Sequence, residues 1–224
     1  MLDNRLSAVA SFVPQGCKVA DIGTDHGYLA MALYQSDNQR LVIAADKNLG
    51  PCEAAKKTLQ ASNLSQYIEV RQGDGLAAVA PGEIDTVCIA GMGGSLIGQI
   101  LAAQPLVFAQ LQQAILQPQN AGDSLREWLY QQGWHVAGEK LAKEDGRIYQ
   151  IILAQPGQEP MPSQVELLVG PKILQERPEL FAEHLHNIIS SYERVVAGLQ
   201  KSSKDTSEQQ QGYQKIIQSL EALL

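Results

Sequence analysis

The chain has 224 residues, a length that suits one well-buried domain with an appended segment better than two full domains. Hydrophobic residues make up 45% of the sequence and charged residues 18%, which excludes an intrinsically disordered or fibrous protein. The formal net charge of -7 excludes a broad basic surface, so any nucleic-acid partner would have to be bound by a local cationic patch.

The cysteine pattern and the N-terminal segment bear on the location of the protein. Cys17, Cys52 and Cys88 are odd in number and show no CxxC spacing, which argues against a disulfide framework and against a zinc site. The first 16 residues lack the basic and apolar regions of a signal peptide, and no run approaches 18 consecutive apolar residues. We therefore expect a cytoplasmic protein with no bound metal and no membrane contact.

Short apolar runs alternate with helix-length segments between Lys18 and Leu153, which is typical of an α/β fold with a parallel sheet. The expected strands are residues 18–23, 41–46, 67–72, 85–90 and 113–117. A helix is expected over Ser124–Gln132, and residues 134–155 hold two β-like stretches around a Glu-Asp-Gly turn. The sequence therefore predicts five parallel strands followed by an antiparallel pair.

The C-terminal third of the sequence predicts a separate helical domain. Three prolines in the ten residues from Gln155 predict a boundary between a domain of residues 1–155 and one of residues 156–224. Two apolar stripes follow at heptad-like spacing: Phe181, Leu185, Ile188, Tyr192, Val195 and Leu199, then Tyr213, Ile217, Leu220 and Leu224. The polar residues 201–212 can reverse the chain between them, so we expect an antiparallel coiled-coil hairpin.

The segment VADIGTDHGYL, residues 19–29, combines a strand, a glycine-containing turn and a helix expected to start near Asp25. Gly23 and Gly27 let the backbone approach a ligand, but Asp25 replaces the middle glycine of a dinucleotide fingerprint. A pyrophosphate would meet that carboxylate, so the turn argues against NAD and favours the cationic, phosphate-free S-adenosylmethionine. A purely structural turn is the alternative interpretation.

Acidic residues also end the next two expected strands. Asp46 stands 23 residues after Gly23, where doubly wound folds place the acid that binds ribose hydroxyls. Asp74, in the segment GDGL, could accept a hydrogen bond from an adenine amino group. Either acid alone could be a helix cap or turn residue, but acids at three consecutive strand ends favour a cofactor site.

The fourth expected strand ends in IAGMGG, residues Ile89–Gly94. Each glycine costs about 1 kcal/mol of chain entropy relative to alanine, so turn formation alone is an insufficient reason for three of them. We interpret this loop as backbone that faces a flat substrate next to the methyl donor. His26, beside Asp25, is either an orienting residue or a proton carrier, and the sequence leaves both roles open.

Six segments occur in the order found in the bacterial tRNA (adenine-22-N1)-methyltransferases, the TrmK family. They are RLSAVASFVPQG, ADIGTDHGYL, QGDGL, IAGMGG, ILQPQNAGDSLREWL and EDGRIYQIILA. The chain resembles this family over essentially its whole length. The resemblance implies a class I Rossmann-like methyltransferase with a C-terminal coiled-coil domain, which uses S-adenosylmethionine to methylate N1 of adenine 22 in tRNA. The chain departs from the family at Ala30, where a proline is usual, and at Asn120, one place later than in the commoner form.

The resemblance implies roles for individual residues. We expect the cofactor to contact Asp21, Gly23, Asp25, Gly27, Asp46, Asp74, Gly75 and Gly91. The expected substrate contacts are Arg5, Met92, Gly93 and Asn120, and the candidate catalytic residues are Asp21, Asp25 and His26. Adenine N1 carries an in-plane lone pair, so positioning matters more than a strong base. Asp3, Asp21 or Asp25 could stabilise the positive charge that develops on the adenine.

The expected partner is tRNA, bound by a monomer through cationic side chains on one face. We nominate Arg5, Lys18, Arg126, Lys201 and Lys204 as phosphate contacts. Two alternatives stay open: a methyltransferase that acts on a small molecule or a protein, and a non-catalytic RNA-binding protein. The first would not need a long helical arm, and the second would not need the cofactor acids.

Overall fold

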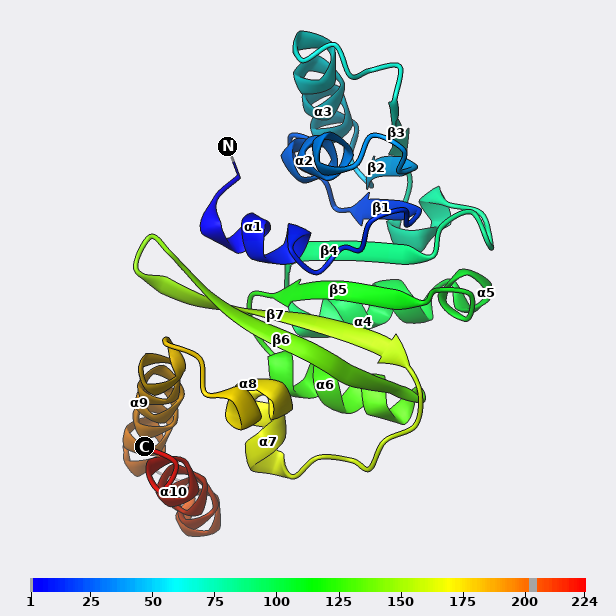
Figure 1. Ribbon diagram of the computed structural model, residues 1–224. Helices are drawn as coiled ribbons and strands as arrows, with labels where there is room; N and C mark the ends of the chain where they lie inside the picture. Colours follow the sequence, from blue (N-terminus) through cyan, green and yellow to red (C-terminus); the bar gives the residue numbers. More distant parts are fainter. Residues whose placement is uncertain (1, 202–204) are drawn as a thin grey trace.

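The structure, a computed structural model, describes residues 2–201 and 205–224 and contains a seven-stranded mixed sheet (Figure 1). The strands are β1 (Val19–Ile22), β2 (Val42–Asp46), β3 (Ile68–Gln72), β4 (Thr86–Met92), β5 (Gln113–Pro118), β6 (Trp134–Glu144) and β7 (Arg147–Pro156). Their order is β3-β2-β1-β4-β5-β7-β6, with β1 to β5 parallel and β7 antiparallel to both of its neighbours. The predicted fold class and sheet are confirmed.

Helices cover both faces of the sheet because successive strand residues point to opposite sides. One face packs against α1 (Asn4–Ala10), α2 (Tyr28–Ser36) and α3 (Leu49–Ala61). The other packs against the short helix η1 (Gly75–Ala78), α4 (Gly94–Ala102), α5 (Pro105–Phe108) and α6 (Gly122–Gln131). In β1, Val19 belongs to the first core and Ala20 and Ile22 to the second, which leaves the strand ends free to form a site.

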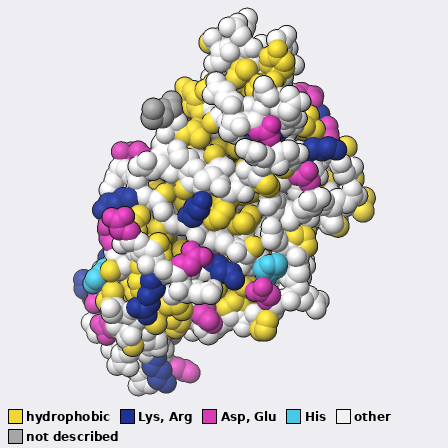
Figure 2. All heavy atoms as spheres, in the orientation of Figure 1, with side chains coloured by type: hydrophobic (Ala, Val, Ile, Leu, Met, Phe, Trp, Pro, Cys, Tyr) yellow, Lys and Arg dark blue, Asp and Glu magenta, His cyan; other side chains and the backbone are white. Residues whose placement is uncertain are grey.

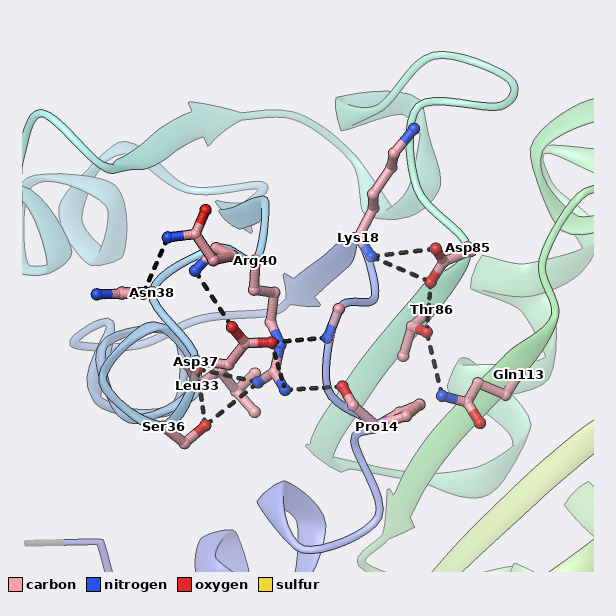
Figure 3. A network of polar contacts seen from close by, with 12 residues as sticks. Pro14, Lys18, Leu33, Ser36, Asp37, Asn38, Arg40, Asp85, Thr86 and Gln113 are labelled. Atoms are coloured by element: carbon pink, nitrogen blue, oxygen red, sulfur yellow. Dashed lines mark hydrogen bonds and ion pairs between the residues drawn. The ribbon is translucent and has the colours of Figure 1, made fainter.

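Polar contacts close the amino-terminal edge of the parallel strands (Figure 3). Arg40 is buried and donates to the carbonyl oxygens of Leu33, at 2.9 Å, and Pro14, at 2.7 Å. The backbone N–H of Lys18 donates to both carboxylate oxygens of Asp85, at 3.2 and 3.1 Å. Lys18 therefore precedes β1 at the edge opposite the strands' carboxyl ends, away from the expected cofactor residues, and we no longer expect it to share one cationic face with Arg5.

The C-terminal part of the chain is helical, as expected. It forms α7 (Gln164–Val169), α8 (Pro171–Glu176), α9 (Phe181–Gln200) and α10 (Ser207–Glu221). The helices α9 and α10 pack together as a hairpin, which we call the arm (Figure 1). Its core holds Phe181, Leu185, Ile189 and Leu220, packed against Val169 of α7 and Ile173 of α8. Lys201 caps α9, whereas Lys204 lies outside the described residues.

The heptad-like stripes are wrong in detail. Val195 is 43% exposed whereas Val196 is buried, and Leu224, at the end of the second stripe, is 55% exposed. A straight α-helix repeats every 3.6 residues and drifts by about 20° per heptad relative to a 3.5-residue repeat. The buried side chains of α9 therefore shift by one position along the helix, to Ile189 and Val196 in place of the predicted Ile188 and Val195.

A buried ion pair joins the sheet to α7 and α8, the two short helices that form the base of the arm. Arg126 of α6 and Glu139 of β6 are both fully enclosed, with 2.7 Å between Nε and Oε1. Arg126 also donates to the Leu167 carbonyl of α7 at 2.9 Å, and Glu139 accepts from the Lys172 N–H of α8 at 2.9 Å. The nomination of Arg126 as a phosphate contact is therefore wrong, because its guanidinium is buried and forms its hydrogen bonds within the protein. The division at residue 155 stays a prediction.

Three further observations complete the description of the fold. No helix in residues 2–201 and 205–224 is long and apolar enough to cross a membrane. Over the same residues, no cluster of three or more His, Cys, Asp or Glu side chains could hold a metal ion. Cys17, Cys52 and Cys88 are buried free thiols.

Candidate active site

The candidate site lies where the sheet changes its winding direction. Strand β1 pairs with β2 on one side and β4 on the other; the crossing from β1 to β2 runs over one face through α2, and the crossing from β4 to β5 runs over the other through α4 and α5. Ligands of open α/β sheets bind at such a point, beyond the carboxyl ends of the strands. The turn after β1, the acids after β2 and β3, and the loops after β4 and β5 all emerge at this edge.

Asp21 lies beneath the turn and is only 5% exposed. Burial, together with the nearby Asp46 carboxylate, raises the pKa of Asp21 to about 6. Gly23 follows with a φ of +83°, and a Cβ at this position would clash with Cε of Met92. The Thr24 hydroxyl is buried beside the Asp21 carboxyl, whose pKa it lowers, but it forms no well-aligned hydrogen bond within the described residues. The turn thus combines an enclosed carboxyl group, a hydroxyl with spare hydrogen-bonding capacity and a glycine backbone.

The second half of the turn, from Asp25 to Gly27, packs against α3 or faces solvent. Gly27 has a φ of +71°, and a Cβ there would lie 3.1 Å from Cβ of Ala55, so this glycine allows α2 and α3 to pack closely. Its left-handed conformation delays the helix to Tyr28, later than the predicted start near Asp25. The side chains of Asp25 and His26 are 81% and 51% exposed, 3.4 Å apart. They are directed to solvent, and Asp21 is the enclosed member of the predicted catalytic set.

Asp46 and Asp74 stand at the rim of the site. Asp46 Oδ1 accepts a 2.7 Å hydrogen bond from the Asn48 N–H, which orients the carboxylate at the end of β2. Asp74 forms a 2.7 Å ion pair with Lys47, and both side chains are 67% exposed. That hydrogen bond raises the pKa of Lys47. Solvent screens such an exposed pair, so Lys47 can be displaced by another donor at low cost.

Helix packing explains why residue 75 is a glycine. Its φ is +58°, and a Cβ there would lie 2.8 Å from Cγ2 of Ile100 on α4. Gly75 therefore lets η1 pack directly against α4, beside Asp74.

The loop after β4 is joined to the loop after β5. Gly91 is an extra residue in the ladder, because Ala90 pairs with Gln117 and Met92 pairs with Pro118. Asn120 Oδ1 would lie 3.0 Å from a Cβ on Gly93, and a Cβ on Gly94 would clash with the Ala121 carbonyl. The Gly94 N–H donates to the Asn120 carbonyl at 2.9 Å. The structure thus brings the predicted substrate residues Met92, Gly93 and Asn120 together.

Arg5 reaches the same loops from α1. Asp3 is the N-cap of this helix and accepts from the Leu6 N–H at 2.6 Å, while Arg5 Nη1 donates to Oε1 of Gln117 at 2.8 Å. The guanidinium also lies 5.8 Å from the centre of the Tyr149 ring. Gln117 was not identified from the sequence because it ends an apolar strand, yet it is fully buried beside Gly91.

A second feature absent from the sequence-based expectations is a cavity of about 770 Å³, which we call the hairpin–arm groove. It lies between the loop after β5, the turn of the β6–β7 hairpin, and α9 with Tyr213 of α10. Its lining includes Asn120, Asp123, Arg147, Tyr149, Arg194 and Tyr213. Neither Arg147 nor Arg194 forms an ion pair with another residue in the described part of the chain. The groove combines residues from five separate segments, since Leu168 of α7 also lines it, so no local motif signals it.

The surface charge agrees with a local cationic contact. Lys and Arg side chains are scattered among Asp and Glu side chains on the face shown in Figure 2. The broad basic surface excluded by the net charge of -7 is accordingly not seen on this face. A cationic side chain in the groove would therefore attract an anion individually and not as part of a broad basic patch.

The residues at the strand ends fit S-adenosylmethionine. Its amino group and sulfonium are cationic, and the turn from Asp21 to Tyr28 carries two carboxylates and no Lys or Arg. The enclosed Asp21 and the Thr24 hydroxyl offer acceptors at the turn, while Asp46 offers one at the end of β2, where doubly wound folds place an acid that binds ribose hydroxyls.

Comparison with known proteins agrees with this arrangement. The model of the tRNA (adenine(22)-N(1))-methyltransferase family TrmK matches residues 19–222. The tRNA (adenine(22)-N(1))-methyltransferase of Bacillus subtilis is 33% identical over 99% of this chain and 95% of its own length. A Streptococcus pneumoniae protein crystallised with S-adenosyl-L-methionine is 32% identical, with a TM-score of 0.85 and full coverage of both chains.

A third relative is the TrmK of M. capricolum, solved in complex with S-adenosyl-homocysteine. It is 25% identical, with a TM-score of 0.82, and the match covers 99% of this chain and 97% of the M. capricolum chain. The match with the family model spans the sheet and the arm alike. The family resemblance drawn from the sequence is confirmed: this chain belongs to the tRNA (adenine(22)-N(1))-methyltransferase family.

Proposed function

We propose that this chain binds S-adenosylmethionine at the carboxyl ends of β1, β2 and β3 and methylates N1 of adenine 22 in tRNA. The observation that carries the proposal is the enclosed Asp21 carboxylate beneath the Gly23 turn, next to the glycine loop after β4. A buried anion of this kind is costly unless a cation compensates it. In this family the natural cation is the cofactor.

The residues of the chain bind the cofactor and orient it. When bound, S-adenosylmethionine supplies an electrophilic methyl group on a sulfonium. Asp21 is ionised above about pH 6 and attracts the cationic end of the cofactor, while Asp46 accepts from the ribose hydroxyls. Asp74 accepts from the adenine amino group of the cofactor after exchanging its exposed ion pair with Lys47.

The target adenine lies against the backbone of Ile89–Gly94. Gly91 leaves its backbone free of a side chain, with no heavy atom nearer than 3.8 Å to the place of a Cβ, and Asn120 lies against Gly93. Asp3 is engaged as a helix cap and Asp25 faces solvent, so we assign the contact with the adenine amino group to loop carbonyl groups. No strong base is needed, because N1 already carries an in-plane lone pair, and the main task is alignment.

The tRNA backbone lies in the hairpin–arm groove. Arg147 and Arg194 offer two exposed cations, and Tyr149 and Tyr213 offer aromatic surface on which an unstacked base can rest. Asn120 lines the groove and also lies against Gly93, so RNA in the groove would be continuous with the target base at the glycine loop. Base extrusion costs a few kcal/mol, which the contacts along the groove would offset.

Two further proposals concern the setting of the protein. It acts in the cytoplasm, supported by the tRNA substrate of the family and by three free buried thiols. It acts as a monomer, because one chain forms both the strand-end site and the groove. Light scattering of the purified protein, alone and with tRNA, checks the second proposal; a dimeric mass would contradict it.

Methylation of bulk tRNA by the purified protein tests the function. The protein is incubated with S-adenosylmethionine and unmodified tRNA, and the digested nucleosides are analysed by mass spectrometry. We expect 1-methyladenosine in the wild-type reaction and almost none with Asp21→Ala. Methyl transfer to a protein or small molecule, with none to tRNA, would replace the proposal by the first sequence-based alternative. Tight tRNA binding without cofactor binding would replace it by the second.

A further inference from the structure

Gln117 is a polar residue in an apolar place. It is fully buried near the end of β5, where Ala114, Ile115 and Leu116 precede it. A buried amide is tolerated when its hydrogen bonds are satisfied, and an unsatisfied one costs about 1 to 3 kcal/mol. Here Oε1 accepts from the Gly91 N–H at 3.0 Å and from Arg5 at 2.8 Å, while Nε2 donates to the Pro118 carbonyl at 3.0 Å.

The Gly91 N–H needs this acceptor because Gly91 is the bulged residue of β4. The register passes from Ala90 opposite Gln117 to Met92 opposite Pro118, so Gly91 has no partner residue in the ladder. Its φ of +81° turns the chain away from regular strand geometry. The Gln117 side chain replaces the missing ladder carbonyl and holds the bulge at a defined place.

The same amide oxygen is held from the other side by α1. Arg5 donates to it, and Asp3 lies 3.4 Å from Arg5 on its own helix. The start of α1 is fixed to the β6–β7 hairpin, because the Asn4 backbone N–H donates to Glu144 at 2.8 Å and the Asn4 side chain donates to the Lys143 carbonyl at 3.0 Å. The position of Gln117 is thus fixed by two elements.

We propose that Gln117 is a positioning residue for methyl transfer, which fixes the bulge at Gly91 and so aligns the loop through Met92 and Gly93 with the cofactor turn. The proposal rests on the proposed function in one respect, that the loop carries the target base. A shift of 1 Å in a reacting group can lower turnover by about a hundredfold. Cofactor binding depends on the acids after β1, β2 and β3, so it should not depend on Gln117.

The test compares three variants of the full chain. Gln117→Met keeps the volume and removes the acceptor, whereas Gln117→Glu keeps an acceptor for Gly91 and a partner for Arg5 and loses only the donor to the Pro118 carbonyl. Gln113→Met is the matched control, because Gln113 is also buried on β5 but bonds to Thr86 at the amino-terminal end, with 3.2 Å between Nε2 and Oγ1. Thermal melting establishes that each variant is folded at the assay temperature.

For Gln117→Met we expect kcat for tRNA methylation to fall about tenfold or more, with the Kd for S-adenosylmethionine within about twofold of wild type. Gln117→Glu and Gln113→Met should keep kcat within about threefold of wild type. Equal losses in the two methionine variants, or a loss of cofactor affinity in place of kcat, would overturn the proposal.

Amide hydrogen exchange separates this proposal from the proposed function. The Gly91 N–H should be protected in wild type and in Gln117→Glu, and should exchange faster in Gln117→Met with other protected amides unchanged. An unchanged Gly91 rate in folded Gln117→Met overturns the role of Gln117, whatever the substrate. An inactive wild-type protein overturns the proposed function, and the accelerated Gly91 exchange would still establish that Gln117 holds the bulge.

Discussion

Asp21 is an ionisable residue buried beneath the turn after β1. Its carboxylate is 5% exposed, and burial together with Asp46 raises its pKa to about 6. Because the folded-state pKa lies above the unfolded value near 3.8, Asp21 favours folding most below about pH 4. This contribution is lost as the pH rises through about 6, where the buried group ionises. At neutral pH the carboxylate is therefore a charge that a bound cation would stabilise.

We predict that Asp21→Asn stabilises the ligand-free protein and weakens cofactor binding. At about pH 8 the free energy of unfolding should rise by about 2 to 3 kcal/mol at most, because a buried charge is removed. The affinity of wild type for S-adenosylmethionine should fall as the pH drops below about 6, and that pH dependence should disappear in the variant. Thermal melting and calorimetry at several pH values check both effects. A wild-type affinity that does not change between about pH 5 and pH 8 would contradict the assignment.

A second prediction concerns Asp46. Asp46→Ala should weaken the binding of S-adenosylmethionine by about 1.5 to 3 kcal/mol, because hydrogen bonds to a charged acceptor are lost. Its bond to the Asn48 N–H is local, so the fold should survive. Calorimetric titration measures the change, with Asp37→Ala at the opposite edge of the sheet as the control. Unchanged affinity in folded Asp46→Ala would remove this residue from the ribose position.

At the scale of elements, the base of the arm belongs with the sheet. The buried Arg126–Glu139 pair needs the Leu167 carbonyl of α7 and the Lys172 N–H of α8 to satisfy its hydrogen bonds. Removing a partner of such a pair leaves charge without compensation. The helices α9 and α10 attach further out, through the apolar side chains of Phe181, Leu185 and Ile189.

We therefore predict different outcomes for two truncations. Removal of residues 180–224 should leave a folded protein that binds S-adenosylmethionine with normal affinity but methylates tRNA poorly, because the groove loses α9. Removal of residues 160–224 should destabilise the protein further, by about 1 to 3 kcal/mol, because Arg126 loses the Leu167 carbonyl and Glu139 loses the Lys172 N–H as buried hydrogen-bond partners. Thermal melting and calorimetry compare the two. Equal stability of both proteins would contradict the role given to the ion pair.

At the scale of the whole molecule, an acidic protein must hold a polyanion. The net charge is -7, and the face in Figure 2 shows cationic and anionic side chains intermixed. Binding must then depend on a few cations placed beside the active site. Arg147 and Arg194 meet this condition in the hairpin–arm groove, and Lys18 does not, because it lies at the opposite edge of the sheet.

The salt dependence of tRNA binding tests this placement. The logarithm of affinity should fall linearly with the logarithm of salt concentration, and each lost phosphate contact should reduce the slope by roughly 0.7 to 0.9. We expect this reduction for Arg147→Ala and for Arg194→Ala, with no change in cofactor affinity. Lys18→Ala is the control and should keep the wild-type slope. A wild-type slope in the double Arg147→Ala, Arg194→Ala variant would place the RNA elsewhere.

The sequence predicted the sheet well because its signals are local. Strands β1, β2, β4 and β5 are largely apolar runs and β3 alternates apolar with polar residues; a turn residue follows each, and all five were predicted within two residues of their ends. The start of α2 was missed because the left-handed conformation of Gly27 depends on its packing against Ala55. The buried line of α9 was misplaced because a heptad repeat was assumed for a straight helix.

The site was predictable to the extent that it follows strand ends. Asp21, Gly23, Asp46 and Asp74 could be named because parallel strands end at one edge of a sheet. Gln117 and the groove residues could not, because their roles depend on contacts between segments far apart in the chain, such as Arg5 with Gln117. The burial of Arg126 had the same origin: its partners come from β6 and α7.

We propose that the strand-end site transfers a methyl group to one nucleotide of tRNA. The most direct measurement uses two tRNA transcripts that differ only at position 22, one with adenine and one with guanine, incubated with purified protein and S-adenosylmethionine. Nucleoside mass spectrometry should find 1-methyladenosine in the first transcript and none in the second. Equal methylation of both transcripts, or methylation at the adenine amino group in place of N1, would contradict the account.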